Sequence, residues 1–162
     1  ALAESQSVVM DIHSEPMERD GKSWEKEWFS ELGDIIDSYP GLTIILSHTG
    51  MTSVENVRKL INSYPKVLFN IKLVANPKKW SNLEPVNTKK MKRGLYEDWA
   101  RLFEEYPERF MLGSDYKFGR KHHGKATDYD KLLGSYRKVL GSLRADVAEQ
   151  IAYKNAIRIF KF

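Results

Sequence analysis

Short apolar runs alternate along the chain with stretches in which apolar residues recur at helical spacing. The apolar runs lie near residues 7–12, 42–47, 66–71 and 109–114. They show little alternation with polar residues, which is typical of strands covered on both faces. Apolar residues three or four positions apart predict amphipathic helices within residues 24–39, 54–64 and 95–106. The chain is therefore predicted to consist of repeated β-α units.

All three of these helices are predicted to end at a Tyr-Pro pair that directly precedes the next apolar run. The pairs are Tyr39-Pro40, Tyr64-Pro65 and Tyr106-Pro107. Proline lacks the N–H that would continue a helix, and it favours extended geometry in the residue before it. Capping-box spacing predicts two helix starts, at Thr52 with Glu55 and at Thr127 with Asp130.

Repeated β-α units predict an α/β fold with a parallel sheet and right-handed crossovers. The sheet is either an open doubly wound sheet or part of a barrel, and four units are half of an eight-fold barrel. A length of 162 residues suits one domain. We interpret segment 73–91 as a long loop of that domain, so that residues 1–162 form a single unit.

Composition narrows the chemistry that the chain can perform. It has no cysteine, so any metal must bind imidazole, carboxylate or water. The net charge is +4, and residues 66–125 are the most basic part. Such a segment could attract an anionic small-molecule substrate or nucleic acid. Because its basic residues are dispersed among acids, a solvated face is favoured and no nucleic-acid role is expected.

The sequence contains no apolar run of the about 18 residues that a transmembrane helix needs. Its start, ALAESQSVVM, lacks the basic and apolar blocks of a signal peptide. We therefore expect a cytoplasmic protein without membrane association. The chain begins with Ala rather than Met, so a targeting signal could precede it.

A side chain that commonly binds metal follows three of the four apolar runs. These residues are His13 after VVMDI, His48 after IILS and Asp115 after FMLGS. In parallel α/β folds the carboxyl ends of the strands form the functional face. The three residues are therefore predicted to share one rim, with His48 on the side of Leu46 if strand alternation continues.

Two imidazoles and a carboxylate suit zinc or a similar divalent cation, which lowers the pKa of bound water to about 7. A strand-end Asp can also accept a proton from that water, and a His outside the coordination sphere can polarise a substrate carbonyl. Each residue alone could instead be part of a hydrogen-bonded loop, but three on one rim favour a site. Glu15 is either a substrate-binding residue or an exposed salt-bridge partner, and Asn70 and Lys72 are candidate polar residues of the rim.

The segments VVMDIHSE, LTIILSHTG and RFMLGSDY and the helix IAYKNAIRIF resemble the C-terminal half of the metal-dependent amidohydrolase superfamily. The resemblance is to its amidohydrolase-related branch, which includes aminocarboxymuconate semialdehyde decarboxylase-like enzymes and small lactone or ester hydrolases. It covers nearly the whole chain. It implies that the three segments are the fifth, sixth and eighth strands of a (β/α)8 TIM barrel, and that the chain holds strands 5–8.

The resemblance also implies residue roles and a reaction. His13 and Asp115 would bind a divalent metal, for which zinc is expected, while His48 and Asp115 would be catalytic. The reaction would be hydrolysis of a C–O or C–N bond or a non-oxidative decarboxylation of a small-molecule substrate.

One feature of the family has no counterpart in this sequence. The family carries a His-x-His pair on its first strand, and no His-x-His occurs among the 162 residues. We therefore expect activity to require an N-terminal half-barrel, covalent or separate, or self-association of half-barrels. The same reasoning predicts that the chain is not a stable monomer. The alternative function is a non-catalytic α/β binding or interaction module.

Overall fold

The computed structural model describes residues 8–14, 16, 22–74, 86–87, 94–116, 121–122, 125–126 and 129–161. The strands of the main sheet are β1 (Val9–Ile12), β2 (Thr43–Leu46), β3 (Val67–Ile71) and β4 (Phe110–Leu112), and β5 (Lys121–His122) and β6 (Lys125–Ala126) form a short hairpin. The α-helices are α2 (Glu25–Ser38), α3 (Val54–Ser63), α4 (Glu97–Glu105), α5 (Tyr129–Leu140), α6 (Ala145–Glu149) and α7 (Asn155–Phe160). Short 3-10 turns span Ser47–Met51 and Pro107–Arg109, and a π-helical turn spans Gln150–Lys154.

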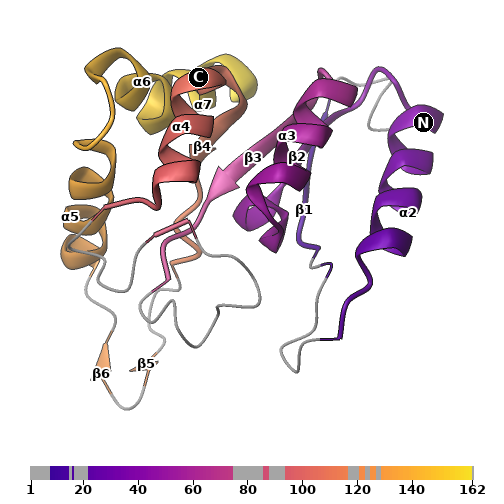
Figure 1. Ribbon diagram of the computed structural model, residues 1–162. Coiled ribbons are helices and arrows are strands. Elements are labelled where there is room, and N and C mark those ends of the chain that lie inside the picture. Colours follow the sequence, from indigo (N-terminus) through magenta and orange to yellow (C-terminus); the bar gives the residue numbers. More distant parts are fainter. Residues whose placement is uncertain are drawn as a thin grey trace.

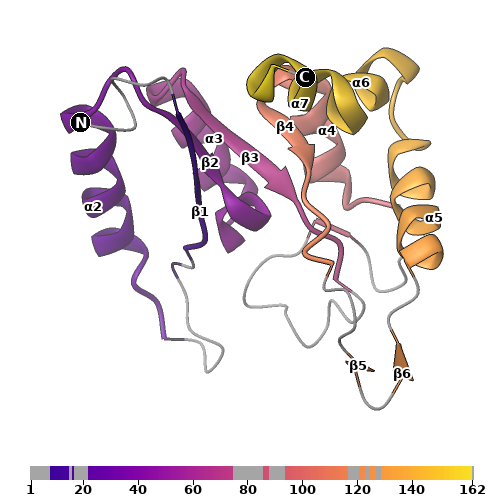
Figure 2. The same ribbon diagram turned by 180° about the vertical axis from the view of Figure 1, so that it is seen from behind.

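The main sheet is parallel throughout. Its strands lie in the order β1-β2-β3-β4, with Asp11 level with Ile45 and Asn70 level with Met111. The strands point toward the end of the molecule that carries β5 and β6, whereas α6 and α7 lie at the opposite end (Figures 1 and 2). The predicted α/β fold with four β-α units is confirmed.

The two faces of the sheet have different neighbours. On one face, the apolar side chains of β2, β3 and β4 pack against the helices in the main core, where Leu46, Phe69 and Phe110 are fully buried. On the other face, Ile45, Leu68 and Met111 form a smaller cluster with the partly buried Val9 and Ile159. This alternation follows from the period of two residues along each strand, and it assigns every strand residue to one of the faces.

Each of the three Tyr-Pro pairs lies where sequence predicts a helix to end. The helices α2, α3 and α4 end at Ser38, Ser63 and Glu105, and in each case the Tyr of the pair follows directly. These predictions are confirmed.

The predicted capping box at Thr52 is wrong, because α3 begins one residue later than that spacing requires. The N-cap is Ser53, whose Oγ accepts a hydrogen bond from the N–H of Asn56 at 3.2 Å. The hydroxyl of Thr52 instead accepts from the side-chain amide of Asn56 at 2.9 Å. The second predicted capping residue, Thr127, lies outside the described residues.

The described ends of segment 73–91 are joined by one buried side chain. Asn87 accepts the N–H of Val74 at 2.8 Å and donates to its carbonyl at 2.9 Å.

A separate finding concerns membranes. In the part of the chain that the structure describes, no helix has the length and apolar character needed to cross a bilayer.

Candidate functional site

The structure brings His13 and His48 together at the carboxyl ends of β1 and β2. Their ring centroids are 5.0 Å apart, and the ring planes meet at 76°, edge to face. His13 is exposed, whereas only 9% of His48 is exposed. Asp115 follows β4 on the same rim, and its charge is close enough to raise the pKa of His48. Two of the three predicted residues therefore touch, and the third lies nearby.

Strand alternation alone does not account for the position of His48. Leu46, two residues earlier, packs among the helices on the far face of the sheet. The strand stops there, and His48, Thr49 and Gly50 adopt left-handed backbones with φ of 59°, 58° and 68°. Residues other than glycine seldom occupy this region. The left-handed turn allows the imidazole of His48 to meet that of His13.

The environment of His48 favours the neutral imidazole. Burial lowers its pKa from 6.5 to about 4, and the electrostatic effects of Lys72 and His13 act in the same direction. The carboxylates of Asp115 and Asp11 oppose this shift without cancelling it. Within the described residues, the Nδ1 atom of His48 has no hydrogen-bond partner. A neutral imidazole has one N–H donor and one acceptor nitrogen, and the unpartnered Nδ1 atom of His48 is buried.

A polar network connects the ends of β1, β2 and β3 beside His48. The hydroxyl of Ser47 donates to Asp11 Oδ1 at 2.6 Å. The side-chain amide of Asn70 donates to Asp11 Oδ2 and to Ser47 Oγ, both at 3.2 Å, and its Oδ1 accepts the backbone N–H of His48 at 2.8 Å. Asn70 therefore contacts groups at the carboxyl ends of β1 and β2.

Asp115 is paired with Lys72 across the ends of β3 and β4. Lys72 Nζ lies 2.5 Å from Asp115 Oδ2, and their side chains are 29% and 32% exposed. Partly exposed ion pairs contribute little to stability. This pair is instead accessible to solvent and small molecules, and Lys72 provides a positive charge for an anionic group.

Tyr136, from α5, joins β3 and β4 next to this ion pair. Its hydroxyl lies 3.2 Å from the carbonyl oxygens of Ile71 and Gly113 and accepts the N–H of Leu73 at 3.3 Å. Burial raises the pKa of Tyr136 to about 12, so the phenol stays protonated as a donor. The backbone on either side of Lys72 is thereby fixed.

One predicted residue cannot be placed, and two others were missed. Glu15 lies outside the described residues. Asp11 and Ser47 also belong to the network, although neither was predicted from the sequence to lie at the site. Alternation gives the missing signal, because Asp11 is level with Ile45, and Ser47 is two residues beyond Ile45 on the face of the smaller cluster.

The rim has ligand atoms of the types that bind divalent cations, but too few of them lie together to form a site. Imidazole nitrogen and carboxylate oxygen are common zinc donors. Among the described residues, however, no group of three His, Cys, Asp or Glu side chains is arranged to hold a metal ion. The carboxylate of Asp115 is paired with Lys72 instead. A metal site on this rim therefore needs ligands from beyond the described residues.

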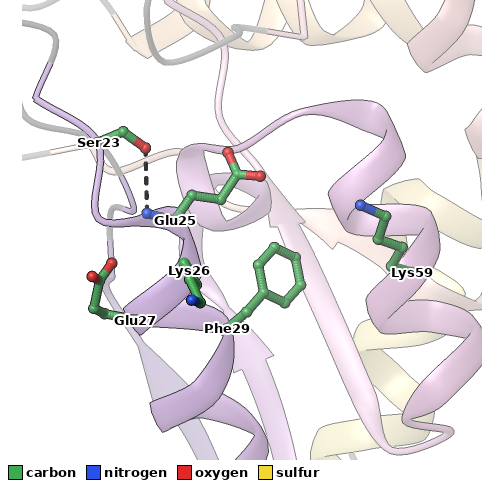
Figure 3. A pocket seen from close by; sticks show the side chains of 6 residues that line it. All are labelled: Ser23, Glu25, Lys26, Glu27, Phe29 and Lys59. Carbon is green, nitrogen blue, oxygen red and sulfur yellow. Dashed lines mark hydrogen bonds between the residues drawn. The ribbon is translucent and has the colours of Figure 1, made fainter.

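A surface hollow of about 430 Å³ lies between the start of α2 and helix α3 (Figure 3). It is lined by Ser23, Glu25, Lys26, Glu27, Phe29 and Lys59. Phe29 and Lys59 lie on opposite sides of the hollow in the close-up view (Figure 3). Because none of the strand-end residues lines it, the hollow is separate from the candidate site.

Comparisons with known proteins agree with this architecture. A sequence model of the family described as Amidohydrolase matches residues 1–162. No match was found among curated proteins.

Two solved structures share the fold of the chain. An uncharacterized TIM-barrel protein of Bordetella bronchiseptica has a TM-score of 0.63 at 14% identity, over 99% of this chain and 48% of its own. A dihydroorotase from Campylobacter jejuni has a TM-score of 0.63 at 15% identity, over 99% of this chain and 49% of its own. The chain thus spans about half the length of the barrels it matches, as predicted for a half-barrel.

Proposed function

Since the chain belongs to the amidohydrolase family, we propose that it forms the second half of a metal-dependent hydrolase barrel. The reaction is hydrolysis of a C–O or C–N bond in a small-molecule substrate. The observation that carries the proposal is the edge-to-face contact of His13 and His48. It lies at the carboxyl ends of neighbouring parallel strands, where α/β barrels place their active sites.

The proposed metal is zinc, because imidazole and carboxylate donors suit it. His13 and Asp115 supply two of its ligands, and the others come from a strand outside this chain that carries His-x-His. When bound, the metal supplies a Lewis acid that lowers the pKa of water to about 7.

The residues of the chain have distinct proposed tasks in the reaction. His48, which its surroundings keep neutral, donates a hydrogen bond to the substrate carbonyl. The carboxylate of Asp115 accepts a proton from the attacking water. Lys72, beside Asp115, orients an anionic group of the substrate. Non-oxidative decarboxylation by the same residues is the alternative reaction.

A complete site requires a partner for the half-barrel. Among the described residues, β1 and β4 are the outer strands of the four-stranded sheet, and such edges can pair with further strands. We propose that the partner is an N-terminal half of the same barrel, covalent or separate, with a second copy of this chain as the alternative.

Metal analysis tests the proposed function. The protein is purified without chelator, alone and with an N-terminal half that carries His-x-His, and zinc is measured by inductively coupled plasma mass spectrometry. We expect about one zinc per completed barrel, and its loss in His13→Ala and in Asp115→Ala. The control variant is Asp37→Ala on the exposed face of α2, which should retain zinc.

The alternative function is a non-catalytic binding or interaction module. It is favoured by one observation, the absence of a three-donor group among the described residues. This alternative predicts no stoichiometric metal even in the completed barrel, and unchanged metal content in the His13 and Asp115 variants. Absence of metal from the completed barrel would rule out the metal-dependent hydrolase, and unchanged metal content in the two variants would rule out His13 and Asp115 as its ligands.

A further inference from the structure

Asn70 occupies the centre of the rim and is itself almost buried. It is the fourth residue of β3, and 7% of it is exposed. Its Oδ1 accepts the N–H of His48 at 2.8 Å, while its Nδ2 donates to the Asp11 carboxylate and the Ser47 hydroxyl. One carboxamide therefore fixes the backbone of His48 relative to two other strand ends.

His48 is the first residue of the left-handed segment, and its backbone N–H is the group that Asn70 binds. His48 and Thr49 each have φ near 60°, a conformation that costs a non-glycine residue about 1–2 kcal/mol. The hydrogen bond from His48 to Asn70 compensates for part of this cost and also satisfies a buried N–H. Without it, the segment loses the contact that holds His48 across from His13.

Gly113, on the neighbouring strand end, makes room for the Asn70 side chain. A Cβ at residue 113 would lie 2.4 Å from Asn70 Oδ1 and 2.5 Å from its Cγ, much closer than real carbon atoms approach. The backbone of Gly113 is not left-handed, so conformational freedom does not explain the glycine. Its N–H donates to the carbonyl oxygen of Ile71 at 3.0 Å, which keeps the ends of β3 and β4 close together. Glycine is required at residue 113 because it leaves space for the Asn70 side chain.

We propose that Asn70 is a positioning residue that sets the place of the His48 imidazole, and that Gly113 is its steric partner. The importance of this placement for catalysis rests on the proposed function, whereas the placement itself does not. The task is specific to a carboxamide, because the same group must accept from an N–H and donate to a carboxylate. A carboxylate cannot donate in this way, and Ala or Ser cannot reach His48.

The test uses the full chain with ¹³C,¹⁵N-labelled histidine and needs neither substrate nor metal. Nuclear Overhauser cross-peaks between the His13 and His48 rings report their contact. We expect these cross-peaks to disappear in Asn70→Ala and in Gly113→Ala, with a shift of the His48 ring resonances. If Asn70→Ala does not fold, Asn70→Ser replaces it with the same expectation. The matched control is Gly134→Ala in α5, where an added Cβ meets no atom within 4 Å, and it should keep the cross-peaks.

A double variant separates positioning from a general loss of structure. Gly113→Ala should lower the urea midpoint in the original chain and lower it less in Asn70→Ala. In that background the contacts with Oδ1 and Cγ at 2.4 and 2.5 Å have gone, and only the 2.8 Å contact with the Cβ atom of residue 70 remains. Cross-peaks that persist in both Asn70→Ala and Asn70→Ser, or equal effects of Gly113→Ala in the two backgrounds, would overturn the inference. The two proposals can fail separately. If the cross-peaks are lost in the Asn70 variants but the completed barrel holds no zinc, the inference is supported and the proposed function is refuted.

Discussion

Individual residues of the rim are held by contacts from other parts of the fold. His48 and Asp115 both have left-handed backbones, with φ of 59° and 47°. Their side-chain directions therefore depend on the groups that stabilise these conformations. For His48 that group is Asn70 on the next strand, and for Asp115 it includes Lys72. Substitutions at such supporting residues should affect the rim without removing any candidate ligand.

Tyr136→Phe should destabilise the chain by about 1–3 kcal/mol, because it leaves the buried N–H of Leu73 without its acceptor. The same change also removes the donor to the carbonyl oxygens of Ile71 and Gly113. Urea unfolding followed by circular dichroism measures the difference. Tyr39→Phe, at a residue that is 36% exposed, is the control and should change stability little. Equal stabilities of the two variants would contradict the structural role of the Tyr136 hydroxyl.

The stability that Tyr136 contributes should depend on pH at the alkaline end. Its pKa is about 12 in the folded chain, compared with about 10 when unfolded, so the unfolded state releases the phenol proton first. The stabilising contribution of Tyr136 is therefore fully present below pH 10 and is lost as the pH rises toward 12. At pH 11, the advantage over Tyr136→Phe should be smaller than at pH 8 by about 1 kcal/mol. An advantage that stays constant between these pH values would contradict the raised pKa.

The placement of His13, His48 and Asp115 on one rim could be predicted from sequence, because each follows an apolar run and strand direction brings such positions together. The network around them could not be predicted in the same way. Asn70 and Gly113 are 43 residues apart in sequence, and their steric relation arises only when β3 and β4 pair. The left-handed turn at His48 could not be predicted either. Glycine is the usual signal for such a backbone, and the sequence SHTGM has glycine only at its fourth position, two residues after His48.

At the scale of elements, helix ends were easier to predict than helix starts. A Tyr-Pro pair acts through covalent geometry, because proline restricts itself and the residue before it wherever the chain folds. An N-cap depends on which hydroxyl meets a free N–H. Thr52 and Ser53 are adjacent candidates, and the turn before α3 determines that Ser53 is the cap. The choice between neighbouring caps therefore depends on tertiary structure.

Ser53→Ala should destabilise the chain by about 1 kcal/mol, because α3 loses the side-chain acceptor for the N–H of Asn56. Ser63→Ala, at the exposed last residue of the same helix, is the matched control and should be close to neutral. Both variants are compared by urea unfolding. If Thr52 were the functional cap, Ser53→Ala would be neutral and Thr52→Ala would carry the loss of stability.

At the scale of the whole molecule, the sheet ends where a barrel would continue. Four parallel strands cover about half of the solved barrels that share the fold. Apolar residues at the start of the outer strand β1 reach solvent, with Val8 48% and Met10 39% exposed. An outer strand with exposed apolar residues tends to pair with another chain. The half-barrel architecture thus leads to a prediction about association.

The purified chain should sediment as an oligomer, because pairing at β1 covers its backbone and the exposed side chains of Val8 and Met10. The double substitution Val8→Lys with Met10→Lys should shift the distribution toward monomer, since charged side chains oppose edge-to-edge pairing. Ile35→Lys on α2, where 42% of the residue is exposed, adds a single positive charge away from β1 and should leave association unchanged. Sedimentation velocity over a range of protein concentrations measures all three. A compact monomer with cooperative unfolding in the unsubstituted chain would show that the half-barrel is stable without a partner.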